Sequence, residues 1–193
     1  MAARAITVTE EEPRSNGWWG MVVFVATEAT LFGVLIATYF YLRFKTPDWP
    51  PDGIADPKIL RPLVFTAILV FTSLPMQMSA LAARAGRHGL LAANLLAALL
   101  IGALYLWLQS DLLRANAESF TPRRNAYGSI YYTLSVGHAA HVFVGLLLNV
   151  WLLSRIRRVT VYRLNGVQAI AFYWHAVNTL AVLVVLTVLS PSL

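Results

Sequence analysis

Five apolar blocks, each long enough to cross a membrane, constrain this chain more than any other feature of its sequence. The hydrocarbon core of a bilayer is about 30 Å thick, which takes about 20 helical residues. Barrel strands would appear instead as short alternating segments. We therefore predict an all-α fold, a bundle of five transmembrane helices forming one membrane domain (17–193) after a polar N-terminal segment (1–16). The predicted spans run near residues 19–44, 62–83, 90–110, 127–154 and 167–189.

The composition supports a membrane protein and excludes several other classes. Hydrophobic residues make up 58% of the chain and charged residues only 12%, about half the charged fraction of a soluble domain. The net charge of +6 lies in short loops between apolar blocks, a pattern of membrane topology, so we expect no nucleic-acid partner. The chain contains no cysteine, which excludes disulfides and thiolate metal sites.

The basic loops predict how the chain is oriented. Residues 84–89 and 155–166 are short and basic, whereas residues 46–61 and 111–125 carry both signs of charge. Because short basic loops stay on the cytoplasmic side, we expect a cytoplasmic N-terminus and a C-terminus on the outer side. Together with the resemblance described below, this predicts a multi-pass protein of the bacterial plasma membrane.

Few polar residues lie deep in the predicted spans. An ionisable group inside a membrane costs at least a few kcal/mol, so a function is the default interpretation. We favour hydrogen bonds between helices or from the imidazoles to the acid. Proton transfer and contacts with lipid headgroups remain open, and ligation of a metal or haem is the weakest reading because the His-x-x-His pattern is unspecific. The candidates, buried and polar or proton-related, are Glu28, His138, His141, His175 and Asn178.

Two further patterns concern how the helices pack. Small residues recur every fourth position in the first and fourth spans, as at Gly33 and Gly145, which lets helices approach closely. Pro75 lies inside the second span. Because proline removes a backbone hydrogen bond, we predict a kink near Leu74.

Aromatic and basic residues at the span ends are candidates for lipid binding. Tryptophans at a membrane interface usually anchor helices, and arginines beside them can hold phospholipid phosphates. An equally good reading of these arginines is a solvated topology signal. The candidates are Trp18, Trp19, Arg155, Arg157 and Arg158.

An ordered series of motifs resembles subunit III of the haem–copper oxidases, the cytochrome c oxidase type. The stretch GMVVFVATEATLFG places Glu28 on that family's buried glutamate, and WPPDGI follows in the next loop. Gln109, Tyr127-Gly128-Ser129, the pair His138 and His141, and Tyr173-Trp174-His175 then follow in the family's order. The resemblance covers nearly the whole chain and corresponds to a five-span form, since longer members have seven spans. Asn178 stands where the family often has aspartate.

The resemblance implies a specific role. A subunit III carries no haem and no copper and has no catalytic residue or metal site of its own. It packs mainly against subunit I, which holds haem and copper, and accompanies subunit II, which holds copper. Bound phospholipid is expected. Other respiratory complexes in a supercomplex are candidate partners, and the sequence does not give supercomplex membership. The implied function is that of a non-catalytic subunit of a proton-pumping terminal oxidase, supporting the stability of subunit I and proton uptake into it.

Two other functions remain open at the level of sequence. The same fold accompanies quinol oxidases and nitric oxide reductases, and the sequence does not give the electron donor. A stand-alone transporter or proton conductor working through Glu28 is the reading from a different class.

Overall fold

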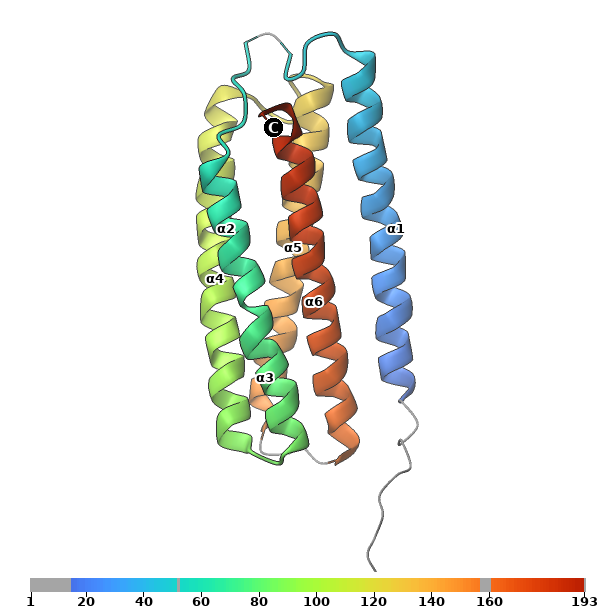
Figure 1. The fold of residues 1–193 in the computed structure, drawn as a ribbon, viewed down its shortest axis with the longest axis vertical. Coiled ribbons are helices and arrows are strands. Elements are labelled where there is room, and N and C mark those ends of the chain that lie inside the picture. The colour runs from blue at the N-terminus through green and yellow to red at the C-terminus, as the bar shows by residue number, and fades with distance from the viewer. Residues whose placement is uncertain (1–14, 52, 157–160, 193) are drawn as a thin grey trace, which may run out of the picture.

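The structure is a computed structural model that describes residues 15–51, 53–156 and 161–192. Within these residues the regular structure is helical, with no strand. Figure 1 shows an elongated bundle whose long helices run side by side. Five helical segments are long and apolar enough to cross a membrane, as the sequence predicted. The elements are α1 (Asn16–Lys45), α2 (Leu60–Phe71), α3 (Ser73–Arg84), α4 (His88–Ser119), α5 (Ala126–Ser154), α6 (Val161–Leu189) and the short 3-10 helix η2 (Ser190–Ser192).

The helices extend beyond the apolar blocks, most clearly in α4. The predicted span ended at residue 110, but the helix continues to Ser119. The continuation, DLLRANAES, is polar yet rich in residues that favour helix. Loss of hydropathy marks where a span leaves the membrane and does not by itself end a helix.

The second span is broken into two helices, which confirms the predicted kink. α2 ends at Phe71 and α3 begins at Ser73, with Thr72 between them. Pro75 has no N–H to donate to the carbonyl of Phe71, and its ring crowds that carbonyl. The chain responds with a tighter turn, in which the N–H of Thr72 donates to the carbonyl of Leu69 at 3.0 Å.

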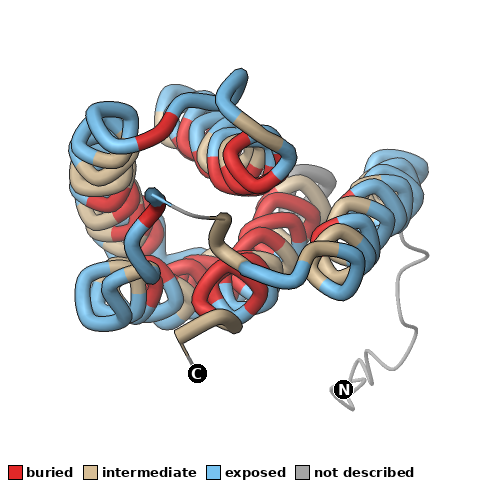
Figure 2. Tube along the Cα trace, turned by 90° about the horizontal axis from the view of Figure 1, so that it is seen from above, coloured by how far each residue is buried: buried red, intermediate tan, exposed pale blue. Residues whose placement is uncertain are grey.

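α6 lies at the centre of the arrangement. It packs against α1, α2, α3 and α5, whereas α4 packs against α2, α3 and α5. Among the described elements, α1 contacts α5 and α6 and stands at the edge of the bundle, as Figures 1 and 2 show. Seen from above in Figure 2, the buried residues face inward and the exposed ones face outward. The outer surface is therefore the apolar one that lipid would cover.

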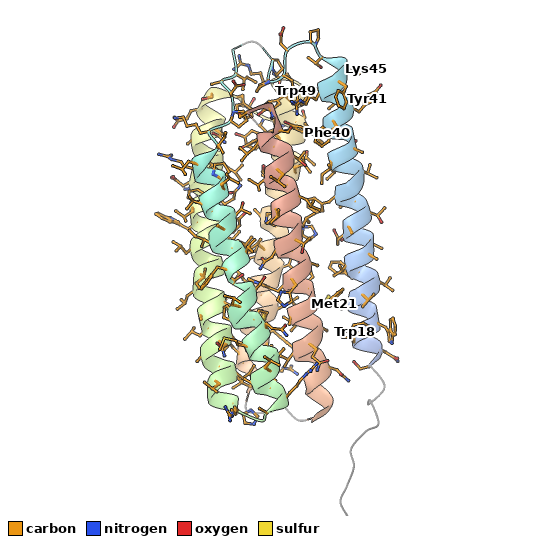
Figure 3. The ribbon with its side chains drawn as sticks, viewed as in Figure 1. Trp18, Met21, Phe40, Tyr41, Lys45 and Trp49 are labelled. Atoms are coloured by element: carbon orange, nitrogen blue, oxygen red, sulfur yellow. The ribbon has the colours of Figure 1, made fainter. Side chains whose placement is uncertain are left out.

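The two ends of the bundle differ in their side chains. Figure 3 shows Trp18 and Met21 near the start of α1, and Tyr41, Lys45 and Trp49 at the opposite end. At that second end the ring of Trp49 contacts the buried Tyr39 and Tyr127, with ring centroids 5.4 and 5.1 Å apart. This aromatic cluster fixes the proline-rich segment after α1 against the start of α5.

Candidate functional site

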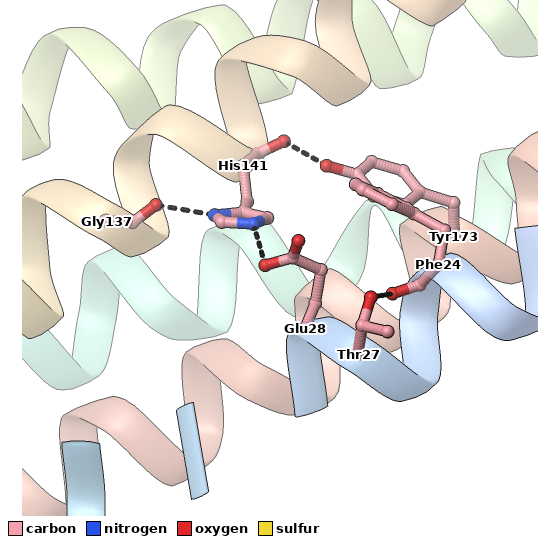
Figure 4. A network of polar contacts seen from close by, with 6 residues as sticks. All are labelled: Phe24, Thr27, Glu28, Gly137, His141 and Tyr173. Carbon is pink, nitrogen blue, oxygen red and sulfur yellow. Dashed lines mark hydrogen bonds and ion pairs between the residues drawn. The ribbon is translucent and has the colours of Figure 1, made fainter. Parts of the chain in front are cut away.

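The acid in the first span is paired with an imidazole from the fourth. Glu28 of α1 lies opposite His141 of α5, and the distance from Glu28 Oε2 to His141 Nε2 is 2.8 Å (Figure 4). Both residues lie near the middle of their helices. Of the polar residues singled out from the sequence, these two are brought together directly, and they tie the edge helix α1 to the bundle.

The other ring nitrogen of His141 determines how the pair shares its protons. His141 Nδ1 lies 2.7 Å from the carbonyl oxygen of Gly137, one turn earlier in α5. A carbonyl oxygen only accepts, so Nδ1 carries a hydrogen. Nε2 then either accepts from a protonated Glu28 or, as part of an imidazolium, donates to a carboxylate. In both states one proton is shared and the pair has no net charge, which suits its depth in the membrane.

A tyrosine from α6 completes the network. The hydroxyl of Tyr173 donates to the backbone carbonyl of His141 at 2.9 Å. Phe32 of α1 packs its ring edge against the imidazole, with ring centroids 5.3 Å apart. Three helices therefore meet at His141. In the sequence Tyr173 was part of a motif only, and nothing in the spacing indicated that it bonds to this backbone.

The pair borders an apolar hollow between α1 and α6. The cavity has a volume of about 350 Å³, and its walls include Ala29, Gly33, Val177 and Leu183. The side chains of Glu28 and His141 are 24% and 19% exposed. The acid is thus neither sealed in the core nor facing bulk lipid: it lies at the wall of a hollow of the size of a small apolar ligand.

His138 lies apart from this network. Its side chain is buried, with the residue only 2% exposed. Neither of its ring nitrogens has a hydrogen-bond partner among the described residues. Its nearest ring neighbour is Tyr105 of α4, at 6.1 Å between centroids. Of the three histidines singled out from the sequence, His138, His141 and His175, the structure brings only His141 to the acid.

His175 and Asn178 lie on another side of α6, beside the break in the second span. The side-chain amide of Asn178 donates to Ser73 Oγ at 2.7 Å and to Thr72 Oγ1 at 3.2 Å. His175 Nε2 lies 3.3 Å from Gln77 Oε1. These contacts are hydrogen bonds between helices.

Thr72 is the residue at this junction that sequence reasoning missed. Its hydroxyl accepts from the indole N–H of Trp174 at 2.6 Å as well as from Asn178. The available signal in the sequence was Pro75. A proline removes a backbone hydrogen bond from the turn before it, and the hydroxyl of a threonine in that turn can then bond to groups of a neighbouring helix. Pro75 by itself predicts the kink, but not the hydroxyl that stabilises it.

Potential metal ligands do not converge in the described residues. No group of three or more histidine, aspartate or glutamate side chains lies close enough there to hold a metal ion. Glu28 and His141 engage each other, while His138 and His175 point to separate surroundings.

Of the residues proposed for lipid contact, Trp18, Trp19 and Arg155 lie at one end of the bundle. Trp18 packs on Trp19 and on Phe172 of α6, with centroids 5.0 and 6.1 Å away. Arg155, just after α5, stacks over the ring of Trp151 at 5.1 Å. Trp19 is 56% exposed. Arg157 and Arg158 lie outside the described residues.

Comparison with known proteins gives one consistent result. The profile of the family described as "Cytochrome c oxidase subunit III" matches residues 12–190. Cytochrome c oxidase subunit 3 of Thermostichus vulcanus is 28% identical over 170 residues, covering 83% of this chain and 80% of the relative. The subunit 3 of Synechocystis sp. is 30% identical, covering 83% and 69%. Cytochrome bo(3) ubiquinol oxidase subunit 3 of Pseudomonas aeruginosa is also 30% identical, covering 83% and 78%.

The family match over residues 12–190 includes both members of the Glu28–His141 pair and reaches into all five apolar helices. The chain belongs to the cytochrome c oxidase subunit III family.

Proposed function

We propose that this chain is the non-catalytic third subunit of a proton-pumping terminal oxidase that takes electrons from cytochrome c. In this role it packs mainly against subunit I, which holds haem and copper, stabilises that subunit and supports proton uptake into it. The observation that carries the proposal is the family match over residues 12–190, which includes the acid in the first span and its imidazole partner. Glu28 and His141 are hydrogen-bonded to each other. The pair is therefore better suited to joining helices and sharing a proton than to redox chemistry.

The identity of the electron donor, cytochrome c or quinol, is the part of the proposal for which a second candidate exists. One relative with 30% identity is named as a subunit of a ubiquinol oxidase, and it matches this chain about as well as the cytochrome c oxidase subunits do. A quinol oxidase is therefore the second candidate. Both candidates give subunit III the same place beside subunit I.

Purification of the native complex tests the proposal. The tagged chain is extracted in mild detergent, and co-purifying chains are identified by mass spectrometry. We expect a haem–copper subunit I and a subunit II, with oxygen reduction driven by reduced cytochrome c. Oxygen reduction driven only by quinol would select the second candidate. Recovery of the chain without any haem–copper subunit would refute both.

We further propose that the hollow between α1 and α6 holds an acyl chain of a bound phospholipid. Its walls are almost entirely apolar, it lies at the depth of the lipid tails, and its volume is about 350 Å³. Trp18, Trp19 and Arg155 at the end of the bundle are suited to the headgroup region, since tryptophan and arginine favour the interface.

Two glycines of α1 provide a matched test of the lipid site. A side chain at Gly33 would enter the hollow, whereas one at Gly20 would point elsewhere, and in both places the first added carbon meets nothing within 4 Å. Gly33→Leu is expected to lower the amount of phospholipid retained by the purified complex, and Gly20→Leu to leave it unchanged. Equal retention by the two variants would argue against the site.

The proposed location is the bacterial plasma membrane, with the N-terminus in the cytoplasm. The turn between α3 and α4, the start of α1 and the end of α5 lie at one end of the bundle (Figure 1). The short connections at that end carry Arg84, Arg87 and Arg155 without a described acid, whereas the longer connections at the other end carry both signs of charge. Short basic loops are typical of the cytoplasmic side. Reporter fusions at the C-terminus test this: a periplasmic alkaline phosphatase should be active and a fluorescent protein that matures only in the cytoplasm should stay dark.

A further inference from the structure

A cavity opens at the end of the bundle opposite Trp18. It lies between the segment that precedes α2, the last part of α4 and the start of α5, and its volume is about 240 Å³. Its walls carry the charged residues Asp56, Lys58 and Arg61. Deeper in the wall, the side-chain amide of Asn116 donates to the hydroxyl of Tyr131 at 2.6 Å. The outer cavity therefore has charged side chains among mostly apolar wall residues, and it lies in the region where the bundle meets water.

A second, smaller cavity adjoins the first and extends further into the bundle. The two share four wall residues, among them Pro62, Leu112 and Tyr131. The inner cavity has a volume of about 40 Å³ and lies among α2, α4, α5 and α6. The shared residues come from α2, α4, α5 and α6, so the two cavities adjoin across side chains of all four helices.

Polar side chains line this inner cavity although it lies within the membrane-spanning part of the bundle. Thr66, Gln109 and Ser135 are on its wall, together with Tyr105 and His138. His138 lies about 18 Å along α5 from its first residue, Ala126, at the helical rise of 1.5 Å per residue. The inner cavity thus reaches roughly the middle of the membrane.

His138 is a buried imidazole on the wall of the inner cavity that lacks a hydrogen-bond partner among the described residues. It is 2% exposed. A buried polar group left without a partner costs about 1–3 kcal/mol. A buried water needs about 10–15 Å³ and two to four polar partners, and the inner cavity offers both.

We propose that water fills these two cavities and connects His138 to the aqueous phase at the end of the bundle that carries Lys58 and Arg61. The bound species are water molecules, held by the imidazole and by the hydroxyl and amide groups on the wall. His138 is then a buried imidazole that exchanges protons with solvent from that side of the membrane. This site is separate from the Glu28–His141 pair, and it does not depend on which electron donor the oxidase uses.

Single cysteines provide the test, because the chain has none of its own. Ala115 lies on the outer cavity and Ser135 on the inner one. Val142, on the same helix, is fully buried and is not on either wall. The variants Ala115→Cys, Ser135→Cys and Val142→Cys are prepared in the complete complex and exposed to silver ion, a thiol reagent about as small as water. Modification of this chain is followed by mass spectrometry.

Ala115→Cys and Ser135→Cys are expected to react with silver at least about tenfold faster than Val142→Cys, since the reactive thiolate forms only where water reaches it. In oriented vesicles, silver should act from the side on which residues 54–61 lie. Ser135→Cys reacting no faster than Val142→Cys would show a dry interior and overturn the proposal. Reaction from the opposite side alone would overturn the proposed route.

A second measurement addresses the imidazole itself in the unmodified complex. The carbon-bound C2 hydrogen of histidine exchanges with heavy water only where water reaches the ring. His88, which is exposed at the start of α4, provides the fully hydrated reference. We expect measurable exchange at His138 despite its burial. Exchange at His88 with none at His138 would contradict the proposal even if the silver test could not be completed.

Discussion

The indole N–H of Trp174 donates to Thr72 Oγ1 at 2.6 Å, at the residue where the second span is interrupted. The same oxygen accepts from Asn178, and its own hydrogen goes to the carbonyl of Leu69. A hydroxyl has one donor and two acceptor positions, so all three are in use. The last helix thus stabilises the break that Pro75 imposes on the second span.

Removing this hydroxyl should destabilise the subunit. Thr72→Val keeps the shape of the side chain but leaves the indole N–H of Trp174 without an acceptor and removes one of the two bonds of the Asn178 amide. This should lower the free energy of unfolding by about 1–3 kcal/mol. Thr72→Ser keeps the hydroxyl and should stay close to the parent. The measurement is the detergent or thermal midpoint at which subunit III leaves the complex.

A control for this substitution is available on the lipid-facing side of α1. The hydroxyl of Thr38 bonds only to the carbonyl of Val34 in its own helix among the described contacts. Thr38→Val should therefore be nearly neutral. If Thr38→Val lowered the midpoint as much as Thr72→Val, the loss would reflect threonine in a membrane helix in general, and the role given to Trp174 would be wrong.

A second prediction concerns the close contact between α5 and α6. A methyl group added at Gly145 would lie 2.7 Å from Cζ3 and 2.8 Å from Cε3 of Trp174. Trp174 is fully buried and cannot move aside easily. Gly145→Ala should therefore destabilise the subunit by about 1–3 kcal/mol through overpacking.

The matched control for Gly145→Ala is Gly20→Ala in α1. Nothing lies within 4 Å of the added carbon there, and alanine favours helix over glycine by up to about 1 kcal/mol. Gly20→Ala should thus be neutral or stabilising in the same midpoint measurement. Equal midpoints for the two variants would mean that Trp174 moves aside to accommodate the added methyl group at Gly145.

The sequence was sufficient for the architecture because length and hydropathy alone limit a chain in lipid. The five spans and the break near Pro75 needed no knowledge of tertiary contacts. Contacts between helices were a different matter. Glu28 and His141 are far apart in sequence, and an i, i+3 histidine pattern gives no indication of which ring turns to α1 and which to the interior. The packing of α1 against α5 determines which of the two histidines faces Glu28, so the pairing could not be predicted from either residue alone.

Substitutions at Glu28 should separate hydrogen bonding from charge. Because Nδ1 of His141 keeps its hydrogen toward Gly137, Nε2 can accept. The amide of Glu28→Gln can donate to it, so we expect intact assembly, unchanged haem content and at most a modest loss of sustained turnover. Glu28→Leu leaves Nε2 without a partner and should weaken retention of the subunit by about 1–3 kcal/mol.

The measurements for Glu28 are subunit stoichiometry, haem spectrum and oxygen uptake over many turnovers. Loss of haem from the Glu28→Gln complex would indicate a ligand role and contradict our interpretation of the pair. Equal retention in the Gln and Leu variants would show that the contact with His141 does not hold α1 in place.

Asn178 provides the final prediction, since aspartate has the same shape but replaces the amide with a carboxylate. In this chain the amide donates to Ser73 Oγ and Thr72 Oγ1 at 2.7 and 3.2 Å. A carboxylate has no hydrogen to donate, and the hydrogen of Thr72 is already directed to Leu69. Only the hydroxyl of Ser73 can rotate to donate to it. Asn178→Asp should therefore lower the unfolding midpoint by an amount corresponding to about 1–3 kcal/mol.

The double variant Asn178→Asp with Thr72→Ser should recover little, because serine makes the same bond to Leu69. A parent-like midpoint for Asn178→Asp would mean that the residues around the break rearrange to accept a carboxylate, and that the amide is not what this junction requires.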